Sequence, residues 1–166
     1  GKLTDHYNPS TKVLNLSESV YGSTSVAAIG VAAHECGHAI QHARGYFPLS
    51  LRTALVPVAN IGSQLSWVFI IVGAILSFNQ TLITIGLIMF SAAVLFQLVT
   101  LPVEFNASAR ALEQLESNGI LYRDEVSQTR KVLSAAALTY VAAAATAILQ
   151  LLRLIILFGG RGRRDD

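Results

Sequence analysis

A charge-free interval in the middle of the chain restricts the fold more than any other feature of the sequence. Between Arg52 and Glu104 there is no Asp, Glu, Lys, Arg or His. A helix needs about 20 mostly apolar residues to cross a bilayer core, and the interval holds two such stretches, at residues 55–78 and 82–101. Only residues 79–81 separate them, with the polar pair Asn79-Gln80 as the break. A loop this short joins antiparallel neighbours, so we expect a membrane hairpin whose two ends, residues 52 and 104, lie on the same membrane face.

A third apolar stretch lies near the C-terminus, at residues 133–158, and a basic tail follows it at residues 159–164. The chain of 166 residues is 52% hydrophobic and only 13% charged, which is about half the quarter usual for a soluble domain. The sequence therefore predicts an integral membrane protein with three transmembrane helices.

The segment ahead of the hairpin is more polar, and it predicts a short strand followed by a helix. Residues 12–16 form the predicted strand, and the serines and threonine at 23–25 offer N-cap oxygens to a helix that continues to about Ala43. We therefore expect a mainly α-helical fold with a short N-terminal β-strand and one helix at the membrane surface. Four regions follow: the strand and surface helix at 1–50, the hairpin at 51–103, a surface segment at 104–130, and the third span with its tail at 131–166.

Charge and cysteine content exclude several classes of partner and bond. The net charge of +2 is too small to indicate nucleic-acid binding, and most basic residues flank apolar stretches, where lipid headgroups account for them. The single cysteine, Cys36, excludes an internal disulfide and is expected to be a small buried residue. Because the chain begins at Gly1 rather than Met, we expect that a preceding segment has been removed.

Five consecutive residues in the predicted surface helix form an H-E-x-x-H motif, His34-Glu35-Cys36-Gly37-His38. Residues four apart lie on one face of a helix, so both imidazoles can reach one metal ion. Glu35 can then act as a general base toward a water molecule at that ion. Such a short pattern also arises by chance, with two incidental histidines, but a buried glutamate here is costly without a metal site.

A catalytic zinc usually has three protein ligands and one open position, so a third ligand is required. Metzincin spacing would put glycine at position 41 and histidine at 44, where this chain has Gln41 and Arg44. His42 lies about 12 Å along the helix axis from His34, so we expect it at the surface or beside a ligand. Glu104 returns to the membrane face that carries the motif and is the favoured third ligand. The alternative is an interfacial glutamate that only marks the end of the membrane span.

These residues resemble those of known zinc peptidases. His34-Glu-x-x-His38 together with Glu104-Phe-x-Ala is similar to the gluzincins, whose membrane-bound members include the Ste24/HtpX-type proteases. The chain also resembles the YugP-type family of bacterial membrane zinc metallopeptidases over nearly its whole length. That resemblance rests on Leu3-Thr-Asp-His-Tyr-Asn-Pro9, Val31-Ala-Ala-His-Glu-Cys-Gly-His-Ala-Ile-Gln41 and Pro102-Val-Glu-Phe-Asn-Ala-Ser-Ala-Arg-Ala111. Family members carry an upstream membrane helix and linker, in agreement with the missing Met.

The resemblance implies a role for each residue of the site. It implies that His34, His38 and Glu104 bind Zn²⁺, and that Glu35 is the catalytic general base. Ste24/HtpX-like enzymes often have Asp four residues after the ligand Glu, where this chain has Ser108. A hydroxyl is a weaker hydrogen-bond partner for a ligand histidine than a carboxylate is.

Three further residues are candidates around the site. Asn106 is a second candidate for orienting a ligand histidine. His6 and Tyr7 could supply a hydrogen-bond donor to the oxyanion, and ordinary loop packing explains both of them equally well.

The function implied is that of a membrane-integrated zinc endopeptidase, which hydrolyses membrane-associated proteins or peptides at the membrane surface. The alternative is a catalytically inert membrane scaffold or metal-binding adaptor that retains the motif, although the intact Glu35 gives it no support. Intramembrane cleavage of the site-2 type fits poorly, because residues 53–103 contain no ionisable side chain.

Two sets of basic residues give opposite orientations in a bacterial cell membrane. Arg161, Arg163 and Arg164 favour a cytoplasmic C-terminus, which would place the zinc site outside. The face that carries the motif is the more basic one and so favours a cytoplasmic site. Its basic residues are Lys2, Lys12, Arg44, Arg52, Arg110, Arg123, Arg130 and Lys131.

Overall fold

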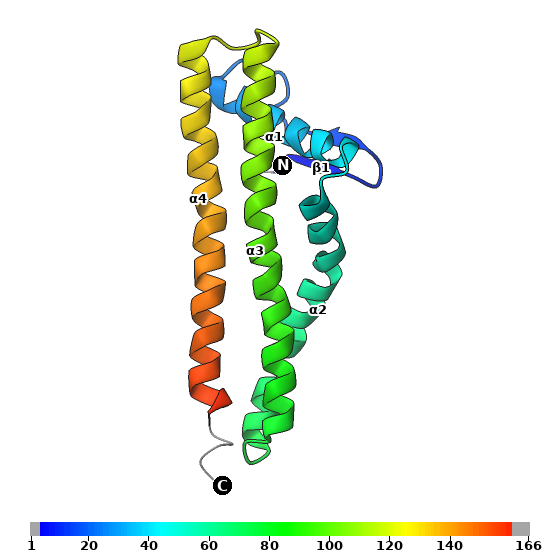
Figure 1. Cartoon of the computed structure of the whole chain (residues 1–166), viewed down its shortest axis with the longest axis vertical. Helices are drawn as coiled ribbons and strands as arrows, with labels where there is room; N and C mark the ends of the chain where they lie inside the picture. The colour runs from blue at the N-terminus through cyan, green and yellow to red at the C-terminus, as the bar shows by residue number, and fades with distance from the viewer. Residues whose placement is uncertain (1–3, 161–166) are drawn as a thin grey trace. The chain divides into compact units, whose positions relative to one another are not determined.

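The computed structural model describes residues 4–160 of the chain, so Lys2 and the basic residues from Arg161 onward lie outside it. The chain forms two short strands, four α-helices and a final π-helical turn within that range (Figure 1). In order they are β1 (His6–Asn8), β2 (Val13–Asn15), α1 (Val26–Ala43), α2 (Phe47–Ile75), α3 (Gln80–Ser117), α4 (Arg123–Leu154) and the turn Ile155–Gly159.

Three of these helices are long and apolar enough to cross a membrane. They are Phe47–Ile75, Gln80–Ser117 and the continuous stretch Arg123–Gly159. The predicted fold class, mainly α with three apolar spans, is confirmed. The helices are longer than their apolar stretches: α3 continues through Pro102, and α4 begins at Arg123 rather than near residue 133. A proline removes one backbone hydrogen bond, and α3 tolerates that local loss.

The N-terminal segment contains two strands, whereas the sequence indicated one. β1 and β2 pair antiparallel, with Tyr7 opposite Leu14. The turn between them is stabilised by the Asn8 side chain, whose Oδ1 accepts hydrogen bonds from the backbone N–H groups of Ser10 and Thr11 at 3.0 and 3.3 Å. A strand of three residues such as β1 is too short to produce a recognisable alternation, which is why the sequence did not indicate it.

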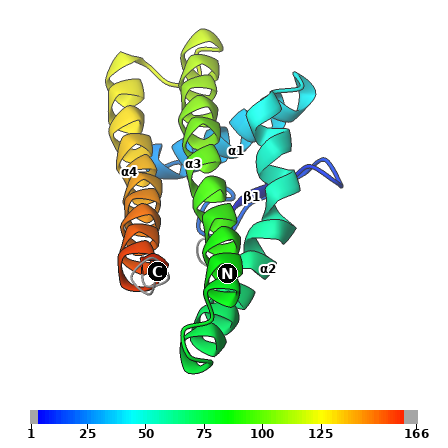
Figure 2. The ribbon, with the colours of Figure 1, turned by 60° about the horizontal axis from the view of Figure 1, so that its bottom comes forward.

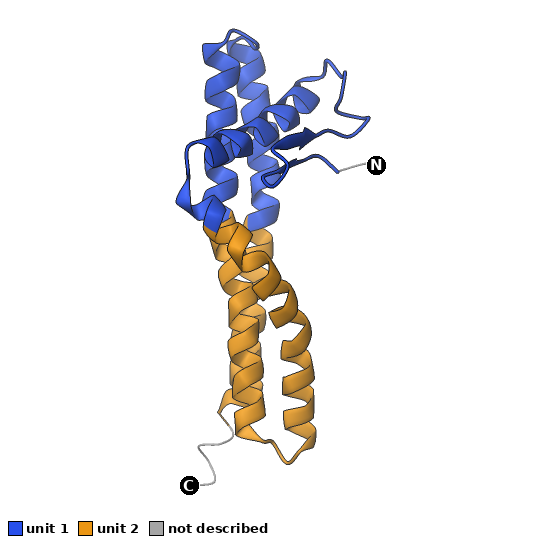
Figure 3. Cartoon of the chain, turned by 90° about the vertical axis from the view of Figure 1, so that its right-hand side faces the viewer, with its two compact units in different colours: residues 1–50, 101–140 blue, residues 51–100, 141–166 orange. Residues whose placement is uncertain are grey.

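The chain divides into two compact units (Figure 3). The first unit contains residues 4–50 and 101–140, and the second contains residues 51–100 and 141–160. All residues of the H-E-x-x-H motif and Glu104 belong to the first unit.

In the second unit, α2 and α3 form the predicted helical hairpin. Asn79 makes the turn, because its backbone N–H bonds to the Gly73 carbonyl at 2.8 Å and its Oδ1 accepts from Leu82 N at 3.2 Å. A Cβ at Gly86 would lie 2.8 Å from the Ser66 carbonyl oxygen. Glycine at this contact therefore lets the two helices approach closely, as small residues commonly do in membrane proteins.

In the first unit, α1 runs across α3, and the neighbouring parts of α3 and α4 lie side by side (Figures 1 and 2). The Ser25 side chain caps α1 by accepting from Ala28 N at 3.1 Å. Gly45, with a φ of 64°, ends the helix in the left-handed conformation that favours glycine. An apolar core holds α1, α3 and α4 together. It consists of Leu115, Leu121 and Val126, with Ile29, Ala33 and Leu112 packed against them.

Helices α1 and α3 come very close at Gly37, inside the H-E-x-x-H motif. A Cβ at that position would overlap the main-chain oxygen of Ala107. The backbones of the two helices therefore meet directly, and any side chain at position 37 would push α1 away from α3. This contact sets how far the histidines of α1 lie from Glu104 of α3.

We expect Gly37→Ala to destabilise the protein and to disturb the site. Overpacking costs about 1–3 kcal/mol, more than the ~1 kcal/mol by which alanine favours a helix over glycine. The thermal unfolding midpoint in detergent should fall. Gly160→Ala is the matched control, since nothing lies within 4 Å of a Cβ at that position. An unchanged midpoint for Gly37→Ala would contradict the close helix contact.

Candidate metal centre

Helix α1 places the motif's three functional side chains together. One ligand atom from each of His34, Glu35 and His38 lies within 4.8 Å of the others. The spacing follows from helix geometry, because position 38 lies four residues after His34 and three after Glu35, so both are its neighbours on the helix surface. The three side chains could hold a metal ion between them.

Helix α3 brings Glu104 to both histidines. Its Oε2 lies 2.8 Å from His34 Nε2, and its Oε1 lies 3.3 Å from His38 Nε2. The two imidazole rings meet edge to face, with their centroids 4.7 Å apart. Two nitrogens and one carboxylate therefore converge on a common point from two different helices.

The group is withdrawn from solvent. Glu35 is 9% exposed, His38 6% and Glu104 3%. An isolated buried carboxylate is very costly, so each needs a partner of opposite charge or a metal ion. Neutral imidazoles facing a carboxylate through their Nε2 lone pairs would repel it, and either ring protons or a shared cation removes that repulsion.

The residues present fit a zinc ion. Zinc favours imidazole nitrogen and carboxylate oxygen at about 2.0–2.2 Å, and in catalytic sites it takes three protein ligands. Ligand atoms arranged tetrahedrally at such bond lengths lie roughly 3.3 Å apart, close to the separations of the Glu104 oxygens from the two Nε2 atoms. His34, His38 and Glu104 would hold the ion, and Glu35 would lie beside it.

Each histidine is also held at its other ring nitrogen, as metal-binding histidines usually are. The Nδ1 of His34 lies 2.9 Å from the Ser108 hydroxyl, and the Nδ1 of His38 lies 3.0 Å from Gln41 Oε1. Asn106, the other predicted partner, makes no hydrogen bond to either ring; its Oδ1 accepts from Gln41 Nε2 at 3.1 Å.

Sequence reasoning considered Gln41 only as a position where a metzincin glycine is missing. Its amide is fully buried, with 0% exposure, and it contacts both His38 and α3. One signal was available: Gln41 lies three residues after His38 and seven after His34, on the same face of α1. A glutamine on that buried face needs a polar partner, and a ligand histidine is one.

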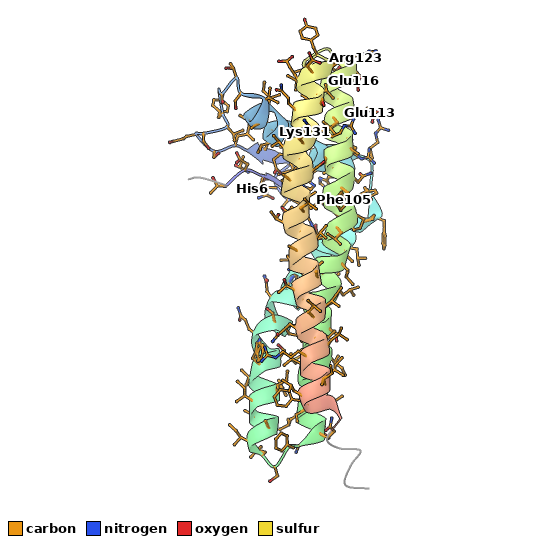
Figure 4. The ribbon with its side chains drawn as sticks, turned by 90° about the vertical axis from the view of Figure 1, so that its left-hand side faces the viewer. His6, Phe105, Glu113, Glu116, Arg123 and Lys131 are labelled. Carbon is orange, nitrogen blue, oxygen red and sulfur yellow. The ribbon has the colours of Figure 1, made fainter. Side chains whose placement is uncertain are left out.

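His6 and Tyr7 lie on β1, which packs against α1. The ring of His6 contacts the Thr4 carbonyl at 2.8 Å and Asn15 Nδ2 at 3.3 Å (its place on β1 is labelled in Figure 4). The Tyr7 hydroxyl hydrogen-bonds to His42 Nδ1 at 2.8 Å, and the main chain of Tyr7 hydrogen-bonds to the Glu35 carboxylate.

Cys36 is exposed rather than buried, so the expectation from its residue type is wrong. It lies on the face of α1 turned away from the two histidines, and there it borders an apolar groove.

A cavity of about 440 Å³ opens onto the group. His34, Glu35, Glu104 and Ser108 form one part of its wall, and side chains of α4, among them Leu133 and Ala137, form another. Burial raises the pKa of the Glu35 carboxyl above its ordinary value, and His38 and His34 oppose that shift. A carboxylate with a raised pKa is a better proton acceptor near neutral pH.

The sequence was also compared with known proteins. The profile of a family described as "Putative neutral zinc metallopeptidase" matches residues 1–159. The "Putative membrane protease YugP" of Bacillus subtilis (strain 168) is 50% identical over 158 residues, which cover 95% of this chain and 70% of the relative. No solved structure matches the chain.

We expect Glu104→Ala to lose stoichiometric zinc, because it removes the carboxylate that lies between the two histidines. Zinc bound to purified protein, measured by mass spectrometry after dialysis against a weak chelator, tests this. Glu113→Ala is the matched control, since Glu113 is an exposed glutamate that projects from the same helix (Figure 4). One zinc per chain retained in Glu104→Ala would show that the third ligand lies elsewhere.

Proposed function

Because this chain belongs to the neutral zinc metallopeptidase family that its sequence matches, we propose that it is a membrane-integrated zinc endopeptidase of gluzincin type. His34, His38 and Glu104 are the proposed zinc ligands, and Glu35 is the proposed general base. The observation that carries the proposal is the convergence of the Glu104 carboxylate on both histidine Nε2 atoms, with Glu35 beside them.

The proposed reaction is hydrolysis of a peptide bond. When bound at such a site, zinc polarises the substrate carbonyl and acidifies a water molecule. Glu35 removes one proton from the attacking water while the oxygen of that water bonds to the carbonyl carbon. Glu35 then transfers that proton to the amide nitrogen, the C–N bond breaks, and a carboxylic acid and an amine leave. No other reactant is consumed.

Tyr7 has a proposed part in this step through its main chain. The backbone of β1 hydrogen-bonds to the Glu35 carboxylate and so restricts its orientation while leaving it ionised. The hydroxyl of Tyr7 is bonded to His42, which holds β1 against α1. His6 and Tyr7 stay candidates for the oxyanion donor.

The proposed substrates are membrane-associated proteins or peptides. The cavity beside Glu35 is large enough for a substrate side chain, and three apolar helices of the same chain are candidates to cross the bilayer. Since the face that carries the motif is the more basic, we place the site on the cytoplasmic side of the bacterial cell membrane. An inert scaffold that keeps the motif would need neither the raised pKa of Glu35 nor a cavity at this carboxylate.

We expect Glu35→Gln to keep its zinc and its proteolytic activity to fall by at least about a hundred-fold. The carboxamide occupies the same space as the carboxylate but cannot accept the proton. Cleavage of a mixture of quenched fluorescent peptides by purified protein in detergent measures the loss, alongside zinc content. Glu113→Gln should behave like the parent. Proteolysis that persists in Glu35→Gln would refute the mechanism, and a parent protein that binds no zinc would refute the metal site.

A further inference from the structure

We propose that Gln41 is a positioning residue that fixes the ring of His38 with its Nε2 lone pair turned toward the metal site. The proposal rests on the function proposed above and adds a residue to it. Gln41 lies on α1 one turn after His38, has no exposed surface, and spans the gap between that ring and α3. Three hydrogen bonds hold its amide.

The orientation of the Gln41 amide follows from partners that can act in one way only. The Val103 carbonyl can only accept, and it lies 2.8 Å from Gln41 Nε2. Asn106 Oδ1, at 3.1 Å, accepts the other proton of the same nitrogen. The Asn106 amide is oriented in turn by Arg110, whose Nε can only donate and lies 2.7 Å from that oxygen. Gln41 Nε2 must therefore face α3, which leaves Oε1 facing His38.

This orientation determines which ring nitrogen of His38 carries the proton. Gln41 Oε1 has no hydrogen to donate, so His38 Nδ1, at 3.0 Å, must be the donor. In a neutral ring the other nitrogen, Nε2, then carries the lone pair. That nitrogen faces the Glu104 carboxylate at 3.3 Å, which is the position required of a metal ligand.

The two histidines are held by different means. The Ser108 hydroxyl beside His34 rotates and can either donate or accept, so it does not select one ring form by itself. The Gln41 amide cannot rotate without losing both of its bonds to α3. It also joins α1 to the residue directly before Glu104, and so it links the two helices that supply the ligands.

Two substitutions distinguish a role of Gln41 in positioning His38 from a role in holding α1 against α3. Gln41→Met removes both the acceptor for His38 and the donors to α3. Gln41→Glu keeps an acceptor for His38 but loses the donors to Val103 and Asn106. Both should lower the unfolding midpoint of the zinc-free protein. If Gln41 positions His38, only Gln41→Met should weaken zinc binding strongly.

The first measurement is the Zn²⁺ dissociation constant of the full chain in detergent, by competition with a chelator. We expect Gln41→Met to weaken binding by about 10–100-fold, as loss of such partners commonly does, and Gln41→Glu to stay close to the parent. Gln128→Met, at an exposed glutamine of α4, is the control and should match the parent. Parent-like affinity in Gln41→Met, or equal weakening in both Gln41 variants, would overturn the positioning role.

The second measurement is the protonation of His38 Nδ1, from ¹⁵N NMR of histidine-labelled, zinc-free protein. We expect Nδ1 of the parent to carry a proton that exchanges slowly with solvent, because Gln41 Oε1 accepts it. In Gln41→Met we expect that proton to exchange faster or to be absent. A parent ring whose Nδ1 carries no proton would overturn the proposal even if Gln41→Met fails to fold. This readout requires neither zinc nor proteolysis, so its failure is distinguishable from failure of the proposed function.

Discussion

The direct contact of the α1 backbone with the α3 backbone at Gly37 and Ala107 is the constraint on which the site depends. The polar contacts of His34, His38 and Gln41 with α3 lie within about one helical turn of it. On α1 these contacts involve positions 34, 38 and 41, which share a face with position 37. A larger residue at 37 would separate that face from Glu104, Val103, Asn106 and Ser108 together.

The contact also explains why a buried charge is tolerated on α3. Glu104 ends an interval of α3 without any ionisable residue, and its carboxylate is 3% exposed. Only side chains that come very close can offset the cost of burying it. Two imidazoles at 2.8 and 3.3 Å do so when their Nε2 atoms carry protons, and a cation shared among the three groups does so in their place. Gly37 therefore allows the Glu104 carboxylate to be buried, because it lets the two histidines come close enough to interact with it.

The distribution of charges along the chain, together with the short polar break at Asn79-Gln80, was sufficient to predict the hairpin, because a long interval without charges has few alternative folds. The two histidines and Glu35 followed from helical spacing, and Glu104 was suggested by the hairpin, which returns the chain to its starting face. The ends of α3 and α4 were not predictable to the same degree. Polar residues on both sides of an apolar span can continue the helix or end it, and a proline such as Pro102 does not decide between these outcomes.

The contacts behind the proposed ligands were the least predictable part. Asn106 was expected to orient a histidine, and in the structure it orients the glutamine that contacts one. No local pattern distinguishes a glutamine that faces solvent from one that bridges two helices, because the difference depends on what α3 places opposite it. Once Val103 and Asn106 are in place, however, the roles of the atoms follow without freedom. The Val103 carbonyl can only accept and the Arg110 guanidinium can only donate, so together they fix the orientation of the Asn106 and Gln41 amides. The Gln41 amide then determines which nitrogen of the His38 ring carries a proton. The arrangement of α3 is thus transmitted to the proposed ligand His38 through two neutral amides, Asn106 and Gln41. The charged group in the series, the Arg110 guanidinium, is only half-buried, so no fully buried charge is added beside the two carboxylates.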